Sequence, residues 1–275
     1  MSLPPDTMIV FGLVRPVQFA APSMVSPQSL PADFTPGPGL LRGRNLLVTG
    51  AQSALGHAVT TALASHGASL LLCTRKERLL AELYDSLVAE NYPEPLLVAM
   101  DLNKADADHF SQLAESLGEE VGALHGIVHM DLPSAPLSPV TLSKVETWET
   151  CLWRVLRQPM QLIRAMVPLL QAADNPSVVL HTLSCGRQGK AYWGPLGCAL
   201  AAMENLCQIL AEEHPDIRFN TLDIGPVDSD LRRRFYPGEN RARLKPVTDP
   251  AVINGFLHLV SGVGESQSGK AFRLA

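Results

Sequence analysis

Residues 49–56 read TGAQSALG, at the end of the apolar run NLLVT. Glycine adopts backbone angles that side chains exclude, and it lets backbone N–H groups come close to a bound group. A glycine turn between a strand and a helix is a common place for phosphate to bind, at the positive end of the helix. The stretch therefore predicts a strand-turn-helix unit facing a phosphate-bearing ligand, with a turn kept for packing alone as the alternative. The candidate ligand contacts in it are Gly50, Gln52, Ser53, Leu55 and Gly56.

Outward from this loop, short apolar runs alternate with longer amphipathic stretches, which is the pattern of strand-helix-strand units in a parallel sheet. The expected strands span residues 45–49, 69–73, 95–100, 126–129, 177–181 and 218–224. The expected helices span residues 56–66, 77–91, 105–117, 145–170, 196–214 and 250–260. The order predicts an α/β fold with a doubly wound parallel sheet of the Rossmann type.

The first 40 residues hold eight of the 22 prolines in the chain. Proline removes a backbone donor and fixes φ, so this density opposes helix and sheet. We expect residues 1–40 to form a proline-rich N-terminal extension and residues 41–275 to form one domain. A chain of 275 residues that is 46% hydrophobic is long enough to bury one large core.

The composition excludes several classes of partner. A net charge of −5 leaves no broad basic surface for nucleic acid, and the basic run from Arg232 to Lys245 is typical of a solvated surface. The five cysteines show no CxxC spacing, which is typical of free thiols in a reducing compartment. No apolar run reaches the roughly 20 residues of a membrane span. We expect a cytoplasmic protein with no metal, no membrane and no nucleic acid partner.

The glycine loop resembles the TGxxxGxG loop of the short-chain dehydrogenase/reductase (SDR) family. Gly50 and Gly56 match the outer glycines of that loop, and Ala54 replaces the middle one. The stretch GRQG at 186–189, followed by Trp193 and Gly194, is similar to the YciK-like branch of the family. The resemblance runs from about residue 42 to the C-terminus. It implies a Rossmann fold, a nicotinamide dinucleotide cofactor and an oxidoreductase activity.

The resemblance also implies how the cofactor binds. Arg75 stands where an acidic residue would hold the ribose of NAD, which favours NADP, with an exposed charge at a helix start as the alternative. Asp101 and Leu102 match the pair that contacts adenine, unless Asp101 only begins a helix. The backbone around Val227 matches the segment that binds the nicotinamide carboxamide. Because Ala54 adds a Cβ on the path of the cofactor, we expect NADP binding to be weakened or lost.

Hydride transfer in the SDR family uses a serine, a tyrosine, a lysine and an asparagine. The tyrosine passes a proton to or from the substrate oxygen, and the lysine one helical turn later depresses the pKa of that tyrosine. In this chain the resemblance places the four positions on Leu183, Leu196, Leu200 and Val155. None of these side chains can move a proton. We therefore expect a protein that acts through NADP(H) binding or assembly and does not catalyse hydride transfer.

The alternative is an NADP-dependent oxidoreductase with relocated catalytic groups. Ser184 and Tyr192 are the weak substitutes nearest to the motif. His129, Asp131 and His181 lie at strand ends, on the edge where open α/β sheets bind ligands, and they could form an acid/base group. A histidine in a short apolar strand is more often a core residue.

The helix expected at residues 196–214 carries a broad apolar stripe. Its members are Leu196, Leu200, Met203, Leu206 and Cys207. Their spacing exceeds what a single core face requires, so a second subunit would cover part of the stripe. This favours a homodimer, or a heterodimer with an SDR relative, paired through the helices at 145–170 and 196–214. Alternatively, the leucines fill the vacated substrate pocket.

Overall fold

The computed structural model describes residues 26–31, 33–74, 77–263 and 267–274. These residues build one parallel sheet with the strand order β1-β10-β7-β6-β5-β2-β3-β4. From β2 the chain runs outward to β4, then returns past β2 to β5 and continues to the opposite edge. This reversal beside β2 is the doubly wound arrangement, so the predicted Rossmann-type fold is confirmed.

The element bounds agree closely with the sequence expectation along most of the chain. The sheet consists of β1 (Gln28–Ser29), β2 (Asn45–Thr49), β3 (Ser69–Thr74), β4 (Leu96–Ala99), β5 (Gly126–His129), β6 (Ser177–Thr182), β7 (Arg218–Asp223) and β10 (Lys270–Arg273). The helices are α1 (Ala54–Ser65), α2 (Glu77–Ala89), α3 (Ala107–Val121), α4 (Val145–Leu152), α5 (Gln158–Gln171), α6 (Gly194–Glu213), α7 (Asp230–Phe235) and α8 (Pro250–Ser261). A separate short ladder pairs β8 (Val227–Asp228) with β9 (Lys245–Pro246).

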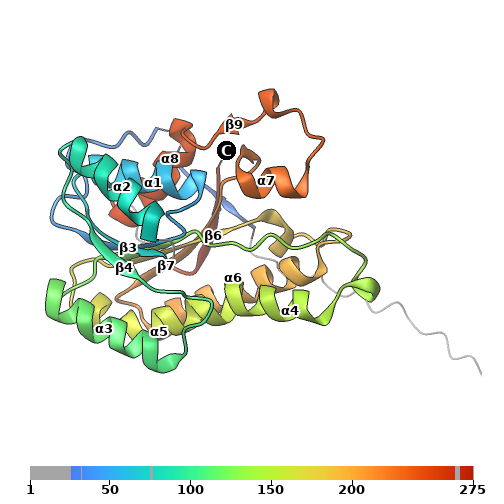
Figure 1. The fold of residues 1–275 in the computed structure, drawn as a ribbon, viewed down its shortest axis with the longest axis horizontal. Coiled ribbons are helices and arrows are strands. Elements are labelled where there is room, and N and C mark those ends of the chain that lie inside the picture. The colour runs from blue at the N-terminus through green and yellow to red at the C-terminus, as the bar shows by residue number, and fades with distance from the viewer. Residues whose placement is uncertain (1–25, 32, 75–76, 264–266, 275) are drawn as a thin grey trace, which may run out of the picture.

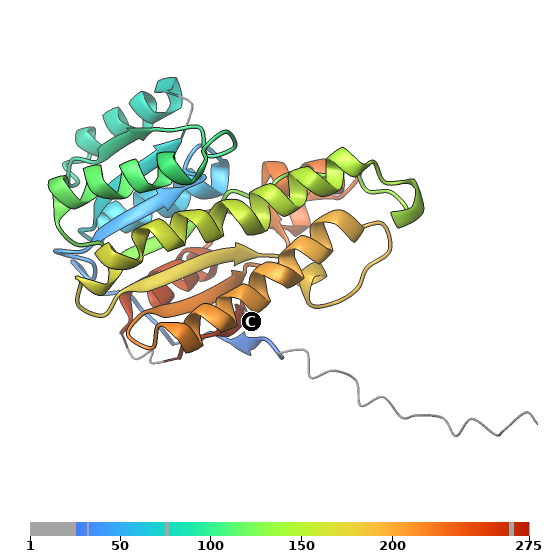
Figure 2. The ribbon, with the colours of Figure 1, turned by 90° about the horizontal axis from the view of Figure 1, so that it is seen from below.

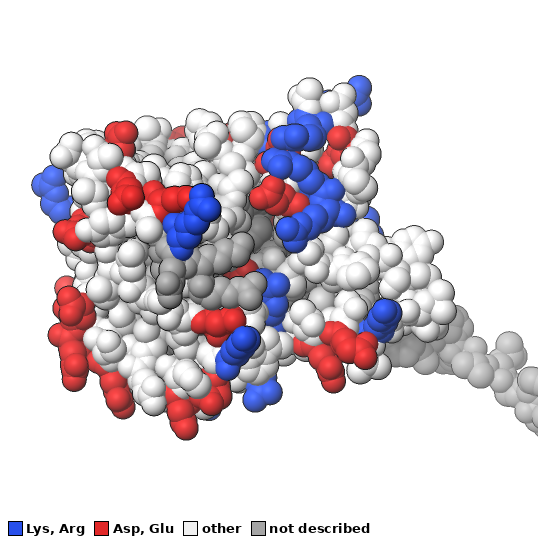
Figure 3. All heavy atoms as spheres, viewed as in Figure 1, with Lys and Arg blue, Asp and Glu red and all other residues white. Residues whose placement is uncertain are grey.

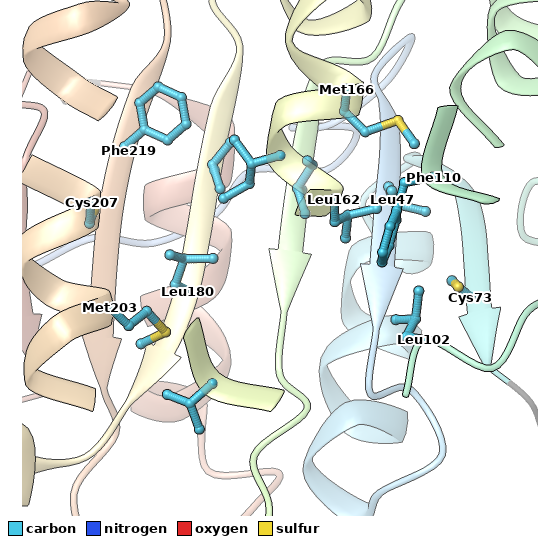
Figure 4. Close-up of a cluster of buried hydrophobic side chains, with 14 of the residues drawn as sticks. Leu47, Cys73, Leu102, Phe110, Leu162, Met166, Leu180, Met203, Cys207 and Phe219 are labelled. Carbon is cyan, nitrogen blue, oxygen red and sulfur yellow. The ribbon is translucent and has the colours of Figure 1, made fainter. Parts of the chain in front are cut away.

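The helices form a layer on each face of the sheet. Figure 1 shows α1, α2 and α8 on one face and α3 to α6 on the other. On the second face the continuous run of α4 and α5 lies beside α6, as the view from below shows (Figure 2). Buried side chains such as Met166, Leu180, Met203 and Phe219 fill the space between these helices and the sheet (Figure 4). None of the helices in the described ranges is both long and apolar enough to cross a membrane.

The two glycines of the loop are required by packing within the fold. Gly50 has φ +81°, and a Cβ on it would lie 2.8 Å from the carbonyl carbon of Met130. A Cβ on Gly56 would lie 2.0 Å from the carbonyl oxygen of Gly50. Ser53 then starts α1, since its hydroxyl accepts a hydrogen bond from the N–H of Gly56 at 2.9 Å. The glycines are therefore needed whether or not the loop binds a nucleotide.

Part of the proline-rich segment packs on the domain. Residues 28–29 form β1, which pairs in parallel with β10 at the sheet edge. The ring of Phe34 lies edge-on to His258 of α8, with the centroids 4.8 Å apart, and Asn254 donates to the carbonyl of Phe34. The expectation that proline excludes sheet from this segment is wrong at β1, because the paired residues fall between Pro27 and Pro31.

The long helix expected at residues 145–170 is divided by a π-helical turn at Trp153–Arg157. The N–H of Gln158 bonds to the carbonyl of Trp153, five residues back. Pro159 lies in the first turn of α5, where its missing N–H is tolerated. The chain therefore accommodates Pro159 by widening one turn, and Val155 lies inside that turn.

The apolar stripe on α6 is covered within the subunit itself. Leu196, Leu200, Met203 and Cys207 are each at most 1% exposed, and all pack into the core beneath the sheet. These four side chains therefore need no second subunit to cover them, whereas the fifth member of the stripe, Leu206, is only partly buried. The four buried side chains pack against those of α4, α5 and the sheet. This agrees with the alternative in which the leucines fill the vacated substrate pocket.

Candidate functional site

A cavity of about 340 Å³ opens at the carboxyl ends of the strands, beside the glycine loop. We call it the loop cavity. Of the predicted cofactor contacts, Gly50, Gln52, Ser53, Asp101 and Leu102 line it. This is the edge of the sheet where the strand order reverses and where such folds bind ligands.

The other predicted contacts lie elsewhere. Leu55 and Gly56 are buried behind the loop, with Leu55 packed in the core beneath α1 and α8. Ala54 is exposed and does not line the loop cavity, so its Cβ does not project into that space. Arg75 falls outside the described residues. Val227 is buried and lines a second, adjacent cavity.

The loop cavity contains an ion pair that the sequence did not predict. Asp131 lies in the turn after β5, and its carboxylate accepts from Nη2 of Arg154 at 2.7 Å. Arg234 of α7 also lines the cavity and donates to the hydroxyl of Ser134 at 3.1 Å. Figure 3 shows Lys and Arg side chains gathered over α7 and β9 above this edge. The cavity therefore combines the carboxylates of Asp101, Asp131 and Asp230 with the guanidinium groups of Arg154 and Arg234.

The second cavity has a volume of about 320 Å³ and shares Leu231 with the loop cavity. We call it the aromatic cavity, because Trp193, Phe235 and Tyr236 line it. The ring centroid of Trp193 lies 4.5 Å from that of Phe235 and 6.1 Å from that of Tyr236. Residues 223–227, after β7, form a further part of the wall.

The four positions that the resemblance assigns to hydride transfer differ in their surroundings. Leu183 lines the aromatic cavity and is partly exposed. Leu196 is 1% exposed, and Leu200 and Val155 are fully buried in the core below the sheet. Leu200 also lies against the GRQG stretch, since a Cβ added to Gly186 would lie 2.8 Å from the Cβ of Leu200.

The two substitutes considered for the tyrosine and the serine are also placed differently. Ser184 lines the aromatic cavity from the turn after β6. Tyr192 is 56% exposed, has φ +75° and does not line either cavity. Only Ser184 of this pair faces a ligand-sized space.

The histidines at the strand ends do not form one acid/base group with Asp131. Nδ1 of His129 lies 2.7 Å from the hydroxyl of Thr49, and Asp131 is paired with Arg154. His181 packs on the other face of the sheet, edge-on to Phe256 of α8. Burial lowers the pKa of both imidazoles to about 4, so each is neutral near pH 7.

A buried ion triad fixes the GRQG stretch against the sheet. Arg187 donates to Glu204 of α6 at 2.7 Å and to Asp223 of β7 at 2.6 Å. Thr182 donates to the same Glu204 oxygen at 2.7 Å. Burial raises the pKa of both carboxyl groups, and the guanidinium of Arg187 opposes that shift. The triad joins α6, β7 and the turn that carries Ser184.

Cys185 lines the aromatic cavity, but burial raises the pKa of its thiol to about 12, which keeps it protonated. Within the described part of the chain, no group of three or more His, Cys, Asp or Glu side chains is placed to hold a metal ion.

Sequence reasoning missed the residues that shape the aromatic cavity. Phe235 and Tyr236 lie within the basic run from Arg232 to Lys245, whose composition is typical of a solvated surface, and Lys190 belongs to no motif of the sequence analysis. The run in fact forms α7, which places Phe235 against Trp193. The pair Trp193-Gly194 was a signal, since it lies inside the most specific motif of the chain.

Comparisons with known proteins agree with this geometry. The short chain dehydrogenase family model matches residues 44–240. The chain is 27% identical to the uncharacterized oxidoreductase YciK of Escherichia coli K12 over 240 residues, which cover 87% of this chain and 94% of that protein. A short chain dehydrogenase structure from Pseudomonas syringae is 32% identical with a TM-score of 0.84, covering 88% of this chain and 98% of that one. Another, from Escherichia coli CFT073 and complexed with NADPH, is 27% identical with a TM-score of 0.83, covering 86% and 99%.

Proposed function

The chain belongs to the short-chain dehydrogenase/reductase family, and from that membership we propose that it binds NADP(H) without transferring hydride. One observation carries the second half of the proposal. Three of the four positions assigned to catalysis, Val155, Leu196 and Leu200, are apolar and at most 1% exposed within the core. The fourth, Leu183, faces the aromatic cavity with no group that exchanges a proton.

The loop cavity supports the binding half of the proposal. Gly50, Gln52 and Ser53 line it at the N-terminus of α1, where phosphate oxygens meet backbone N–H groups and a positive helix end. Arg154 and Arg234 add positive charge to the same space. The relative complexed with NADPH has the same fold. When bound, the dinucleotide supplies a hydride donor or acceptor at its nicotinamide ring, which we place near Val227 in the aromatic cavity.

We further propose that the affinity for the dinucleotide is weakened. Asp131 places a carboxylate in the loop cavity, where it repels phosphate oxygens. The ion pair with Arg154 offsets that repulsion only in part, and it occupies a guanidinium group that would otherwise contact phosphate. Weakening through Asp131 replaces the expected clash at Ala54, which lies outside the cavity.

The experiment that tests the absence of hydride transfer is a turnover assay with the full chain. NADPH and NADP⁺ are supplied with a broad panel of carbonyl compounds and alcohols, and nicotinamide absorbance is followed. We expect rates equal to those in buffer, because no side chain at the four positions moves a proton. A rate clearly above buffer would contradict the proposal.

A second candidate function, an NADP-dependent oxidoreductase with relocated groups, is favoured by one contact. Lys190 donates a hydrogen bond to the hydroxyl of Tyr236, and both side chains line the aromatic cavity together with Ser184. A lysine beside a tyrosine hydroxyl, with a serine nearby, is the combination of groups that the family uses for proton transfer. The main proposal is preferred because this pair comes from two loops and lies at the rim, outside the helix that normally carries it.

The two candidates are separated by a matched pair of variants in the same assay. If wild type turns over, the second candidate requires that Tyr236→Phe abolish the rate and Tyr192→Phe preserve it. Tyr192 is the control because it is exposed and lines neither cavity. Equal rates in both variants would dismiss Lys190 and Tyr236 as the relocated groups.

We also propose that the chain assembles as a dimer through the outer faces of α4 and α6. Leu152 and Ile209 are 40% and 45% exposed on these helices, which lie side by side. Light scattering at tens of micromolar tests this, with Ile209→Glu as the probe. We expect twice the subunit mass for wild type and less for the variant, whereas a monomeric wild type would contradict the proposal. Met203→Glu is unsuitable because Met203 is fully buried and its substitution would disturb folding.

A further inference from the structure

The aromatic cavity is suited to a small ligand with an apolar body. Its volume of about 320 Å³ lies at the small end of the range for small-molecule sites, about 300–1,000 Å³. Trp193 and Phe235 are nearly buried and tilt toward one another across its wall. Ile224 and Val227 extend the apolar surface from the segment after β7. Flat rings pack well against aromatic walls of this kind.

The rim of this cavity carries one cation without a carboxylate partner among the described residues. The ammonium group of Lys190 lies 5.3 Å from the ring centroid of Trp193 and 4.9 Å from that of Tyr236. The other charged groups of the lining are paired: Arg232 with Glu239 through two bonds of 2.6 Å, and Asp223 with Arg187. Lys190 is exposed, so an anion can approach it at the cavity mouth.

The cavity floor carries a buried polar group that lacks a partner. His181 lines the cavity, is 4% exposed, and has no hydrogen-bond partner for either ring nitrogen among the described residues. His129, on the neighbouring strand, differs because it bonds to Thr49. Leaving a buried donor and acceptor unsatisfied is unfavourable, so a ligand group that reaches His181 gains a hydrogen bond and relieves that cost.

We propose that the aromatic cavity binds a small organic carboxylate with a flat apolar body. Its carboxylate pairs with Lys190 at the rim, its body packs against Trp193 and Phe235, and a hydroxyl or carbonyl group at its far end bonds to His181. The ligand would occupy the same cavity in which we place the nicotinamide ring near Val227, but the proposal does not rest on the proposed function, because the contacts with Lys190 and His181 form without a dinucleotide. The two cavities share only Leu231.

The carboxylate contact is tested by calorimetric titration of the full chain, without nucleotide, with 3-phenylpropanoate and its neutral amide. We expect the acid to bind about tenfold more tightly than the amide, the gain of a charge-assisted hydrogen bond. Lys190→Gln should remove that difference. Lys144→Gln, at an exposed lysine at the start of α4, is the matched control and should keep it.

Three results would overturn the carboxylate contact. The first is equal affinity of wild type for the acid and the amide, and the second is an unchanged ratio in Lys190→Gln. The third is no heat of binding for either compound at millimolar concentration. Lys190 is exposed, so the variant is expected to fold. An independent NADPH titration separates failure of this site from failure of the proposed function.

The contact with His181 is tested by adding a hydroxyl group to the same probe. We expect 3-(4-hydroxyphenyl)propanoate to bind several-fold more tightly than 3-phenylpropanoate in wild type, because a neutral hydrogen bond contributes about 1 kcal/mol, roughly fivefold. His181→Leu should abolish this preference and keep the ratio of acid to amide. Equal affinity of wild type for the two acids would overturn this part of the proposal, whether or not the leucine variant folds.

Discussion

At the scale of single residues, we propose that Asp131 weakens dinucleotide binding in the loop cavity. Its carboxylate lines the cavity and lies 2.7 Å from Nη2 of Arg154, a guanidinium group that lines the same cavity. The two side chains come from the turn after β5 and from the π-helical turn, so their meeting depends on the fold. The sequence identified Asp131 only as a member of an acid/base group, because Arg154 is 23 residues away along the chain.

Replacing this carboxylate should strengthen dinucleotide binding. We expect Asp131→Asn to bind NADPH about three- to tenfold more tightly than wild type, since the change removes a negative charge and releases Arg154 toward phosphate. Nicotinamide fluorescence measures the affinity, and circular dichroism checks the fold. Glu115→Gln removes an equal charge from the exposed face of α3 and should have no effect. Unchanged or weaker binding by the Asp131 variant would show that the carboxylate does not oppose the ligand.

We propose that Arg75 sets the preference between NADPH and NADH; this residue lies outside the described part of the chain, and the proposal comes from the sequence alone. A guanidinium group pairs with a 2′-phosphate, and such charge-assisted contacts contribute about 1.5–3 kcal/mol. We therefore expect wild type to prefer NADPH over NADH and Arg75→Ala to lose most of that preference. A variant that keeps the wild-type preference in parallel titrations would remove Arg75 from the site.

At the scale of elements, the buried triad of Arg187, Glu204 and Asp223 joins the segments that frame the aromatic cavity. Both carboxylate side chains are 9% exposed, and that of Arg187 is 10% exposed. Charges this deeply buried are tolerated only when paired, because desolvation is costly. The triad therefore fixes the turn after β6 to α6 and β7, which holds Ser184 and Trp193 in place.

Removing the central cation should destabilise the fold strongly. Arg187→Met leaves two buried carboxylates without their partner, and we expect a loss of about 3–5 kcal/mol in the free energy of unfolding. Urea denaturation measures it. Arg164→Met, at an exposed arginine on α5, is the control and should change stability by less than about 0.5 kcal/mol. A loss below about 1 kcal/mol in the Arg187 variant would contradict this, because it would mean that Glu204 and Asp223 remain buried at little cost without the guanidinium group.

The elements that could be predicted from sequence are those with a strong local pattern. β2 and β5 begin and end where the apolar runs do, and the bounds of α6 and α8 differ from expectation by two residues or fewer. The small elements were missed. β10 spans only Lys270–Arg273 and has little apolar pattern of its own, since its place is fixed by pairing with β7. The segment of α7 lacks an apolar stripe, and it contacts the core through the buried Phe235 and the partly buried Leu231.

The candidate site was predictable only in part, because many of its residues are far apart in the sequence and meet only in the fold. Contacts made by a contiguous motif, such as Gly50 to Ser53, follow from the sequence. The ligand-facing residues of the aromatic cavity come from four separate segments that meet only at the sheet edge. His181 illustrates the limit, because its apolar neighbours in β6 are typical of a core histidine. That its nitrogens lack partners is a property of the packed structure.

At the scale of the whole molecule, the buried histidines couple stability to pH. The pKa of His129 and of His181 falls from 6.5 to about 4 on folding, because burial disfavours the charged ring. The unfolded chain therefore binds more protons between those values, and stability is full above pH 6.5 and is lost as pH falls toward 4. Glu204 and Asp223 act in the opposite sense, since their pKa values are raised on folding.

A single variant isolates the histidine contribution. Between pH 6.5 and 5 each buried histidine should account for about 1.5 kcal/mol of lost stability, because the unfolded ring is half protonated at pH 6.5 and nearly fully protonated at pH 5. His181→Phe should reduce the loss by that amount, whereas His57→Phe, at an exposed position on α1, should not. The free energy of unfolding in urea at the two pH values gives the result. Equal losses in His181→Phe and wild type would mean that the ring is protonated in the folded chain.

We propose that the molecule as a whole binds NADP(H) and does not use it for hydride transfer. The most direct measurement follows nicotinamide fluorescence as NADPH is titrated into the full chain, and then over hours after a carbonyl panel is added. We expect a saturable change in emission, a weaker response to NADH, and a signal that stays constant once the panel is present. No saturable change with NADPH, or emission that decays faster than in buffer, would contradict it.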